Sequence, residues 1–142
     1  MATPNFFTED TRDYHMTMQI YHKEKAKQHK ALANVIDLKL YIKEVGEKSF
    51  LPIVHTYGEF SWNGRFSLLT GVIHCDNDGK FYKSPSGFAT AHIKSLIAIG
   101  LYTGDAKVYK GTNGWTEVKI IMGNGRKIRL DTYRLLKKID EN

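Results

Sequence analysis

The sequence predicts an α+β fold: an N-terminal helical region and a small antiparallel sheet that carries one central helix and a short C-terminal helix. Three observations predict it. Residues 8–45 contain neither Gly nor Pro, which favours an uninterrupted helix. Beyond Gly46, Gly, Asn and Asp recur between short apolar runs, as is typical of strands joined by turns. In residues 88–97 the apolar side chains repeat at helical spacing.

The N-terminal helix is expected to begin near Thr8, whose hydroxyl can cap it, with acidic residues in the first turn where the helix dipole favours them. Residues 22–30 are almost all polar, so most of this helix should be solvated. A thin apolar stripe remains, and it either covers the core or docks another protein chain. The stripe comprises Tyr14, Met18, Tyr21 and Ala33.

Residues 35–45 fit two interpretations. Apolar and polar residues alternate from Ile36 to Ile42, as in a strand, but the apolar positions also fit the period of a helix. Because no helix breaker occurs before Gly46, we favour a continued helix. Two regions of one compact domain result, an N-terminal helical region (1–46) and a basic α+β core (47–142).

Four short strands are expected at the start of the core. Phe50–His55 and Gly58–Trp62 are followed by Asn63-Gly64, a dipeptide typical of a tight turn. Strands 71–74 and 80–82 flank Asp76-Asn77-Asp78-Gly79, a strong hairpin signal.

The central helix should start at Ser84-Pro85, with Ser84 as N-cap and Pro85 at the first helical position, and should stop at Gly100. Residues 116–122 then alternate as a strand, and a turn at 123–126 leads into a last strand at 127–130. Asp131 is expected to cap the final helix.

Composition narrows the class of protein. With 142 residues, 42% hydrophobic and 25% charged, the chain has the proportions of one globular domain. There is no apolar run of 18 residues, so no membrane span is expected, and the N-terminus does not resemble a secretory signal. Cys75 is the only cysteine, which fits a reducing compartment and predicts an intracellular protein, nuclear or cytoplasmic.

The positive charge is concentrated in the core. Residues 1–50 carry 8 Lys/Arg against 7 Asp/Glu, whereas residues 51–142 carry 13 against 8. A basic excess in the half with the strand and turn signals fits a polyanionic partner, and it equally fits a charge that serves only solubility.

Several short motifs occur in a fixed order: Asp78-Gly79 in a hairpin, Ser84-Pro85-Ser86 with Ala89 at a helix start, and Asn113-Gly114-Trp115 entering a strand. Over about residues 58–122 this order resembles the RAMA domain, which accompanies restriction enzymes and adenine methylases. In outline it is also similar to the SAND domain, without that family's lysine-rich loop. Both resemblances imply association with DNA or chromatin.

Two clusters are candidates for contact with nucleic acid. A Ser-Pro-Ser helix start presents free backbone N–H groups and hydroxyls at the positive end of the helix dipole, which suits a phosphate, although capping of the helix alone also explains these residues. Lys80 and Lys83 lie just before it. The last hairpin is also basic, and its alternation places two of its cations on one face. The predicted contact residues are Lys80, Lys83, Ser84, Ser86, Arg126, Lys127 and Arg129.

Catalytic and metal signals are weak. Asp105 followed by Glu117-Val118-Lys119 matches the carboxylates and lysine of metal-dependent nucleases, which stays as an alternative. The run His74-Cys75-Asp76 has no second His/Cys pair at ligand spacing, so no metal, cofactor or small-molecule substrate is inferred.

The sequence therefore predicts a non-catalytic DNA-binding or accessory subunit of a DNA-modifying complex, such as an adenine methyltransferase, or of a chromatin complex. In that role the N-terminal helix would contact other protein subunits. The alternative is a protein–protein scaffold without direct contact to nucleic acid.

Overall fold

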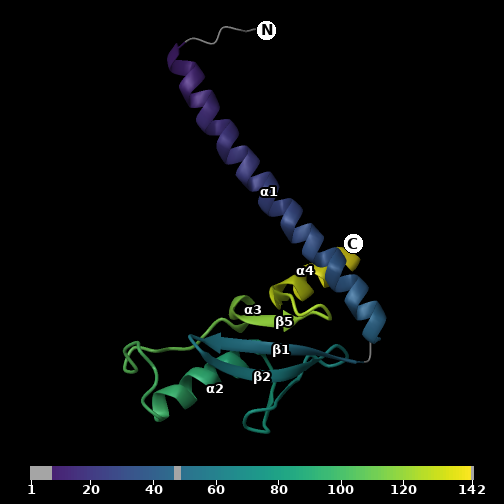
Figure 1. The fold of residues 1–142 in the computed structure, drawn as a ribbon, viewed down its shortest axis with the longest axis vertical. Coiled ribbons are helices and arrows are strands. Elements are labelled where there is room, and N and C mark those ends of the chain that lie inside the picture. The colour runs from purple at the N-terminus through teal and green to yellow at the C-terminus, as the bar shows by residue number, and fades with distance from the viewer. Residues whose placement is uncertain (1–7, 47–48, 142) are drawn as a thin grey trace. The chain divides into compact units, whose positions relative to one another are not determined.

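The computed structural model describes residues 8–46 and 49–141 and confirms the α+β class. The chain divides into two units, residues 1–34 and residues 35–142. The first unit contributes most of one long helix. The second holds the end of that helix, a six-stranded antiparallel sheet and three further helices (Figure 1).

Helix α1 (Thr8–Val45) is continuous over 38 residues, so the helical interpretation of residues 35–45 is confirmed. Its side chains at 25–33 are all exposed, including Ala33. The other predicted stripe residues, Tyr14, Met18 and Tyr21, have side chains outside the described part, as does the predicted cap Thr8. Val35 and Leu38 are buried because their spacing of three places both on the helix side that faces the core of the second unit.

The sheet has the order β4-β3-β2-β1-β5-β6, and every neighbouring pair is antiparallel. The central strands β1 and β2 are the longest, and the edge strands are short, which limits pairing with other chains. The strands are β1 (Phe50–Tyr57), β2 (Phe60–Ser67), β3 (Ile73–Cys75), β4 (Phe81–Tyr82), β5 (Val118–Ile121) and β6 (Lys127–Arg129).

The predicted turn at Asn63-Gly64 is wrong. β2 runs through both residues, and the hairpin turns instead at Gly58-Glu59, where Gly58 has a φ of 57°. Gly64 serves packing. A Cβ at this position would lie 2.8 Å from the Phe88 ring and 2.8 Å from the carbonyl oxygen of His74.

The predicted strand entry at Asn113-Gly114-Trp115 is also wrong. Asn113 caps a short helix, α3 (Gly114–Glu117), by accepting a hydrogen bond from the Trp115 N–H (3.2 Å), and the strand begins only at Val118. Trp115 still packs partly buried against the core, under the guanidinium of Arg134 at 4.3 Å.

Helix α2 (Pro85–Ala98) begins as predicted. The Ser84 hydroxyl accepts from the Gly87 N–H (3.1 Å), Pro85 occupies the first turn, and Gly100 follows the helix with a φ of 79°. Helix α4 (Asp131–Asp140) differs in its cap. Its N-cap is Leu130, and the Asp131 carboxylate lies within the first turn, paired with Arg134 at 2.7 Å.

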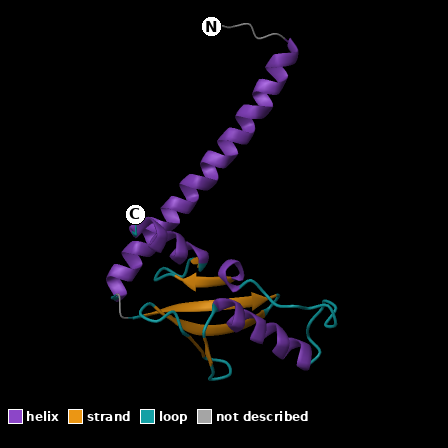
Figure 2. Cartoon of the chain, turned by 180° about the vertical axis from the view of Figure 1, so that it is seen from behind, coloured by secondary structure: helices purple, strands orange, loops and turns teal. Residues whose placement is uncertain are grey.

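The core of the second unit lies on one face of the sheet. Seen from behind in Figure 2, α2 crosses in front of the strands. The fully buried side chains at the centre of this core include Leu51, Ile53, Phe66, Phe88, Val118 and Ile120.

None of the helices in residues 8–46 and 49–141 combines the length and apolar character needed to cross a bilayer.

Candidate functional site

The motifs singled out in the sequence meet in the structure. The Gly114 N–H donates to the Ser86 hydroxyl (3.0 Å), which joins the start of α3 to the start of α2. The contact is so close that a Cβ on Gly114 would lie 2.0 Å from the carbonyl carbon of Pro85. The hydroxyls of Ser84 and Ser86 each accept a hydrogen bond from a backbone N–H group of the fold, from Gly87 and Gly114 respectively.

The predicted contact residues are not brought together on one surface. Lys80 and Lys83 flank β4 beside the start of α2, whereas Lys127 and Arg129 belong to β6 at the opposite edge of the sheet. Five strand spacings separate these edges, about 24 Å. Arg126, in the turn before β6, pairs with Asp37 at 2.7 Å.

The face of the sheet turned away from the core is the larger candidate surface, which we call the open face. Residues paired directly across antiparallel strands share a face, and so do residues two apart on one strand. The registers therefore define fourteen outward positions, most of them exposed. They are Phe50, Pro52, Val54, Thr56, Ser61, Asn63, Arg65, Ser67, His74, Phe81, Lys119, Ile121, Lys127 and Arg129.

The fourteen strand positions carry charge of one sign, although the Asp76 carboxylate, which follows β3, pairs with Arg65. Four of the fourteen positions are Lys or Arg, and none of the fourteen, all within the described part, is Asp or Glu. Lys119 and Arg129 are direct cross-strand partners. Because the Leu130 N–H bonds to the Val118 carbonyl, the next pair along is a non-hydrogen-bonded one, where opposing side chains come closest. Two like charges so placed repel each other.

The β3–β4 end of the open face combines aromatic and basic groups. The Phe81 ring, 71% exposed, packs on the His74 ring with centroids 4.8 Å apart. The Arg65 guanidinium donates to Nδ1 of His74 (2.9 Å) and pairs with the Asp76 carboxylate at 3.5 Å. His74 therefore accepts at Nδ1 and holds Arg65 beside Phe81.

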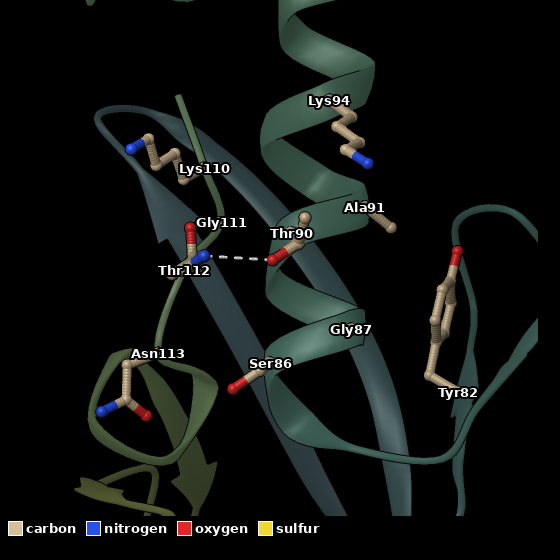
Figure 3. A pocket seen from close by; sticks show the side chains of 10 residues that line it. All are labelled: Tyr82, Ser86, Gly87, Thr90, Ala91, Lys94, Lys110, Gly111, Thr112 and Asn113. Atoms are coloured by element: carbon tan, nitrogen blue, oxygen red, sulfur yellow. Dashed lines mark hydrogen bonds between the residues drawn. The ribbon is translucent and has the colours of Figure 1, made fainter. Parts of the chain in front are cut away.

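A second candidate is an open hollow of about 630 Å³ beside α2 (Figure 3). Thr90 accepts a hydrogen bond from the Thr112 N–H (3.1 Å) and ties the hollow's two walls together. Lys94 and Lys110 lie on opposite sides of α2 in Figure 3, so their ammonium groups do not converge on one point. The hollow lacks the focused charge of a small-anion site.

Two buried histidines lie between the sheet and α2. His55 and His92 are 3% and 2% exposed, and their Nδ1 atoms are 2.8 Å apart, so one ring donates and the other accepts. The Trp62 ring stacks on His92 with centroids 5.1 Å apart. Burial, with a smaller contribution from His55, lowers the pKa of His92 to about 4, and burial also lowers the pKa of His55. Both rings are structural in this setting.

The nuclease alternative finds no assembled centre. Glu117 ends α3, and Asp105 lies in the preceding loop, where its carboxylate accepts from the Lys107 N–H (3.0 Å). Within the described ranges no three His, Cys, Asp or Glu side chains cluster as metal ligands would. His74 and Cys75 are neighbours on β3, so their side chains lie on opposite faces of the sheet. His74 is on the open face, and Cys75 is buried in the core.

Sequence reasoning missed Arg65 and gave Lys119 another role. Lys119 occupies one phase of the alternation at residues 116–122, and Lys127 and Arg129 occupy one phase of the next strand. The alternation shows which residues of each strand share a face. Only the strand register places these three cations on the same face of the sheet. No known family model matches the chain, and no characterised protein is significantly similar to it in sequence.

Proposed function

We propose that this chain is a non-catalytic DNA-binding module that acts inside the cell as an accessory subunit of a DNA-modifying or chromatin complex. The single observation that carries the proposal is the open face, with four cations, no carboxylate among its fourteen strand positions, and a like-charge pair at Lys119 and Arg129. Phosphate groups that lie close to both cations offset the repulsion in such a pair.

The joined motifs support the same proposal. Ser84-Pro85-Ser86 and Asn113-Gly114-Trp115, which carry the resemblance to the RAMA domain, form one contact between α2 and α3. That contact positions the helices against the core side of the sheet. It leaves the opposite, basic side available for DNA.

The rival is a protein–protein scaffold, which one observation favours. Ile36 and Leu40 lie four residues apart on the part of α1 that belongs to the second unit and are 60% and 58% exposed. An exposed apolar stripe of this kind suits a partner helix or groove. The two functions are compatible, because an accessory subunit binds both DNA and protein.

The test is a salt titration of DNA binding by the double variant Lys119→Gln with Arg129→Gln. We expect weaker binding for every DNA sequence and a fall of roughly two in the slope of log K against log salt, about one unit for each lost phosphate contact.

The matched control is Lys94→Gln with Lys110→Gln, which removes the same charge beside α2. It should keep most of the affinity and most of the salt slope. Absence of DNA binding by the unmodified protein at low salt would replace this proposal with the scaffold.

A further inference from the structure

Phe81 is an exposed aromatic side chain that the fold does not require for its core. It is 71% exposed, compared with 52% for Phe50, the other phenylalanine on the open face. It belongs to the edge strand β4, and exposed lysines stand on both sides of that strand at positions 80 and 83. Large apolar rings that remain in water beside cations are typical of surfaces on which bases stack.

The ring is held in place although it is exposed. On one side it packs on His74, which is fixed by Arg65. The backbone of β4 is fixed at Lys80, whose carbonyl accepts from the Cys75 N–H (2.9 Å) and whose N–H donates to the Asp78 carboxylate (2.8 Å). A ring fixed before binding loses little conformational entropy when a ligand stacks on it.

The width of the open face bears on the form of the nucleic acid. The major groove of B-DNA is about 12 Å wide and admits a helix or a two-stranded ribbon. The six-stranded sheet spans about 24 Å from β4 to β6 and cannot enter it. Bases inside a duplex also present no face to an aromatic ring, whereas a single strand presents both its bases and its phosphates.

We propose that the ligand of the open face is single-stranded DNA, with an unpaired base stacked on Phe81 beside His74 and the phosphates running across the sheet toward Lys119 and Arg129. The paired residues Phe81, His74 and Arg65 form a row that reaches β1 at Pro52, and the neighbouring row on the same face runs from Val54, two residues along β1, to Lys119 and Arg129. These two adjacent rows are the physical track. This inference rests on the proposed function and specifies its ligand.

The experiment measures binding of a fluorescent oligonucleotide of about twelve nucleotides, as a single strand and as a duplex of the same sequence. The variant is Phe81→Leu, which keeps an apolar side chain but removes the aromatic face. The matched control is Ile99→Ala, which alters an apolar side chain of similar exposure, 67%, at the end of α2.

We expect the unmodified protein to prefer the single strand. Phe81→Leu should weaken single-strand binding by about fivefold or more, the lower end of base–aromatic stacking, without changing the salt slope. Duplex binding and the Ile99→Ala variant should be unchanged. A 2-aminopurine base in the strand should show less quenching with Phe81→Leu than with the unmodified protein.

Two results would overturn the inference alone, and a third would overturn the proposed function with it. If Phe81→Leu binds the single strand normally while the Lys119/Arg129 double variant loses affinity, the stacking site is wrong and the proposed function stands. If the duplex binds as tightly as the single strand, the assignment of the ligand is wrong. If both Phe81→Leu and the Lys119/Arg129 double variant bind the single strand normally, the proposed function fails as well.

Discussion

The buried pair His55 and His92 makes stability depend on pH through single protons. Each ring is nearly inaccessible, and the 2.8 Å contact between their Nδ1 atoms needs one ring with a proton there and one without. A proton added to the accepting nitrogen replaces this hydrogen bond with a contact between two donors. The folded state therefore favours neutral imidazoles.

We predict that the free energy of unfolding falls as the pH drops from about 6.5 toward 4. The pKa of His92 is about 4 in the folded protein against a usual value of 6.5, so over this range the unfolded chain binds more protons. Each such proton lowers stability by up to about 1.4 kcal/mol per pH unit, and above pH 6.5 the effect vanishes. Urea titrations at several pH values measure it.

The fall in the free energy of unfolding between about pH 6.5 and 4 should be shallower in His92→Gln, whose side chain cannot titrate. This holds even if that variant is less stable at neutral pH. His29→Gln, at an exposed position of α1, is the control and should keep the full slope. Equal slopes in the unmodified protein and in His92→Gln would contradict the assignment.

At the scale of the element, the start of α2 is the feature that sequence described most completely. Ser84 accepts from the Gly87 N–H and Pro85 lies in the first turn, as the local pattern predicted. Such caps are visible in sequence because donor, acceptor and backbone angle all lie within four residues.

We predict that Ser84→Ala lowers the free energy of unfolding by about 1 kcal/mol, the usual effect of a lost N-cap. Ser84→Asp restores an acceptor at the same position and should recover most of that loss. Chemical denaturation of the three proteins gives the comparison. A loss equal in both variants would show that the hydroxyl acts in another way than as a cap.

Other elements could not be read locally. Asn63-Gly64 has the composition of a turn, but Gly64 is required in β2 because Phe88, from α2, fills the space of its side chain. Asn113-Gly114-Trp115 likewise forms α3 because Gly114 packs on the backbone of Pro85, 29 residues earlier. Both errors come from contacts between distant segments, which a local pattern does not contain.

At the scale of the whole molecule, fold class and basic character followed from the sequence, whereas the shape of the candidate site did not. Local periodicity indicated which residues of each strand share a face. It did not give the order β4-β3-β2-β1-β5-β6, which places Lys80 and Lys127 at opposite edges. Local periodicity also did not predict the strand register, which aligns Lys119 with Arg129.

The separation of the two basic edges has a measurable consequence. Lys80 and Lys83 lie about 24 Å from Lys127 and Arg129, more than twice the Debye length of about 8 Å at physiological ionic strength. Sites this far apart and without shared partners normally contribute independently. Lys80 alternates with Phe81 and so lies on the core side of the β4 edge. A strand of DNA that spans the open face and passes round that edge would contact both pairs of cations, and each contact would add its own share to the affinity.

We therefore predict additive losses of binding free energy. Neutralising Lys80 and Lys83 to Gln, and separately Lys127 and Arg129, should each weaken binding of a long single strand, and the combined variant should lose the sum to within about 0.5 kcal/mol. An oligonucleotide too short to span the sheet should respond to only one pair.

Neutralising Lys23, Lys25 and Lys27 on α1 should matter much less, because acidic residues balance the charge of that region. If the α1 variant lost binding while both edge variants kept it, the DNA would contact the N-terminal helix and not the open face.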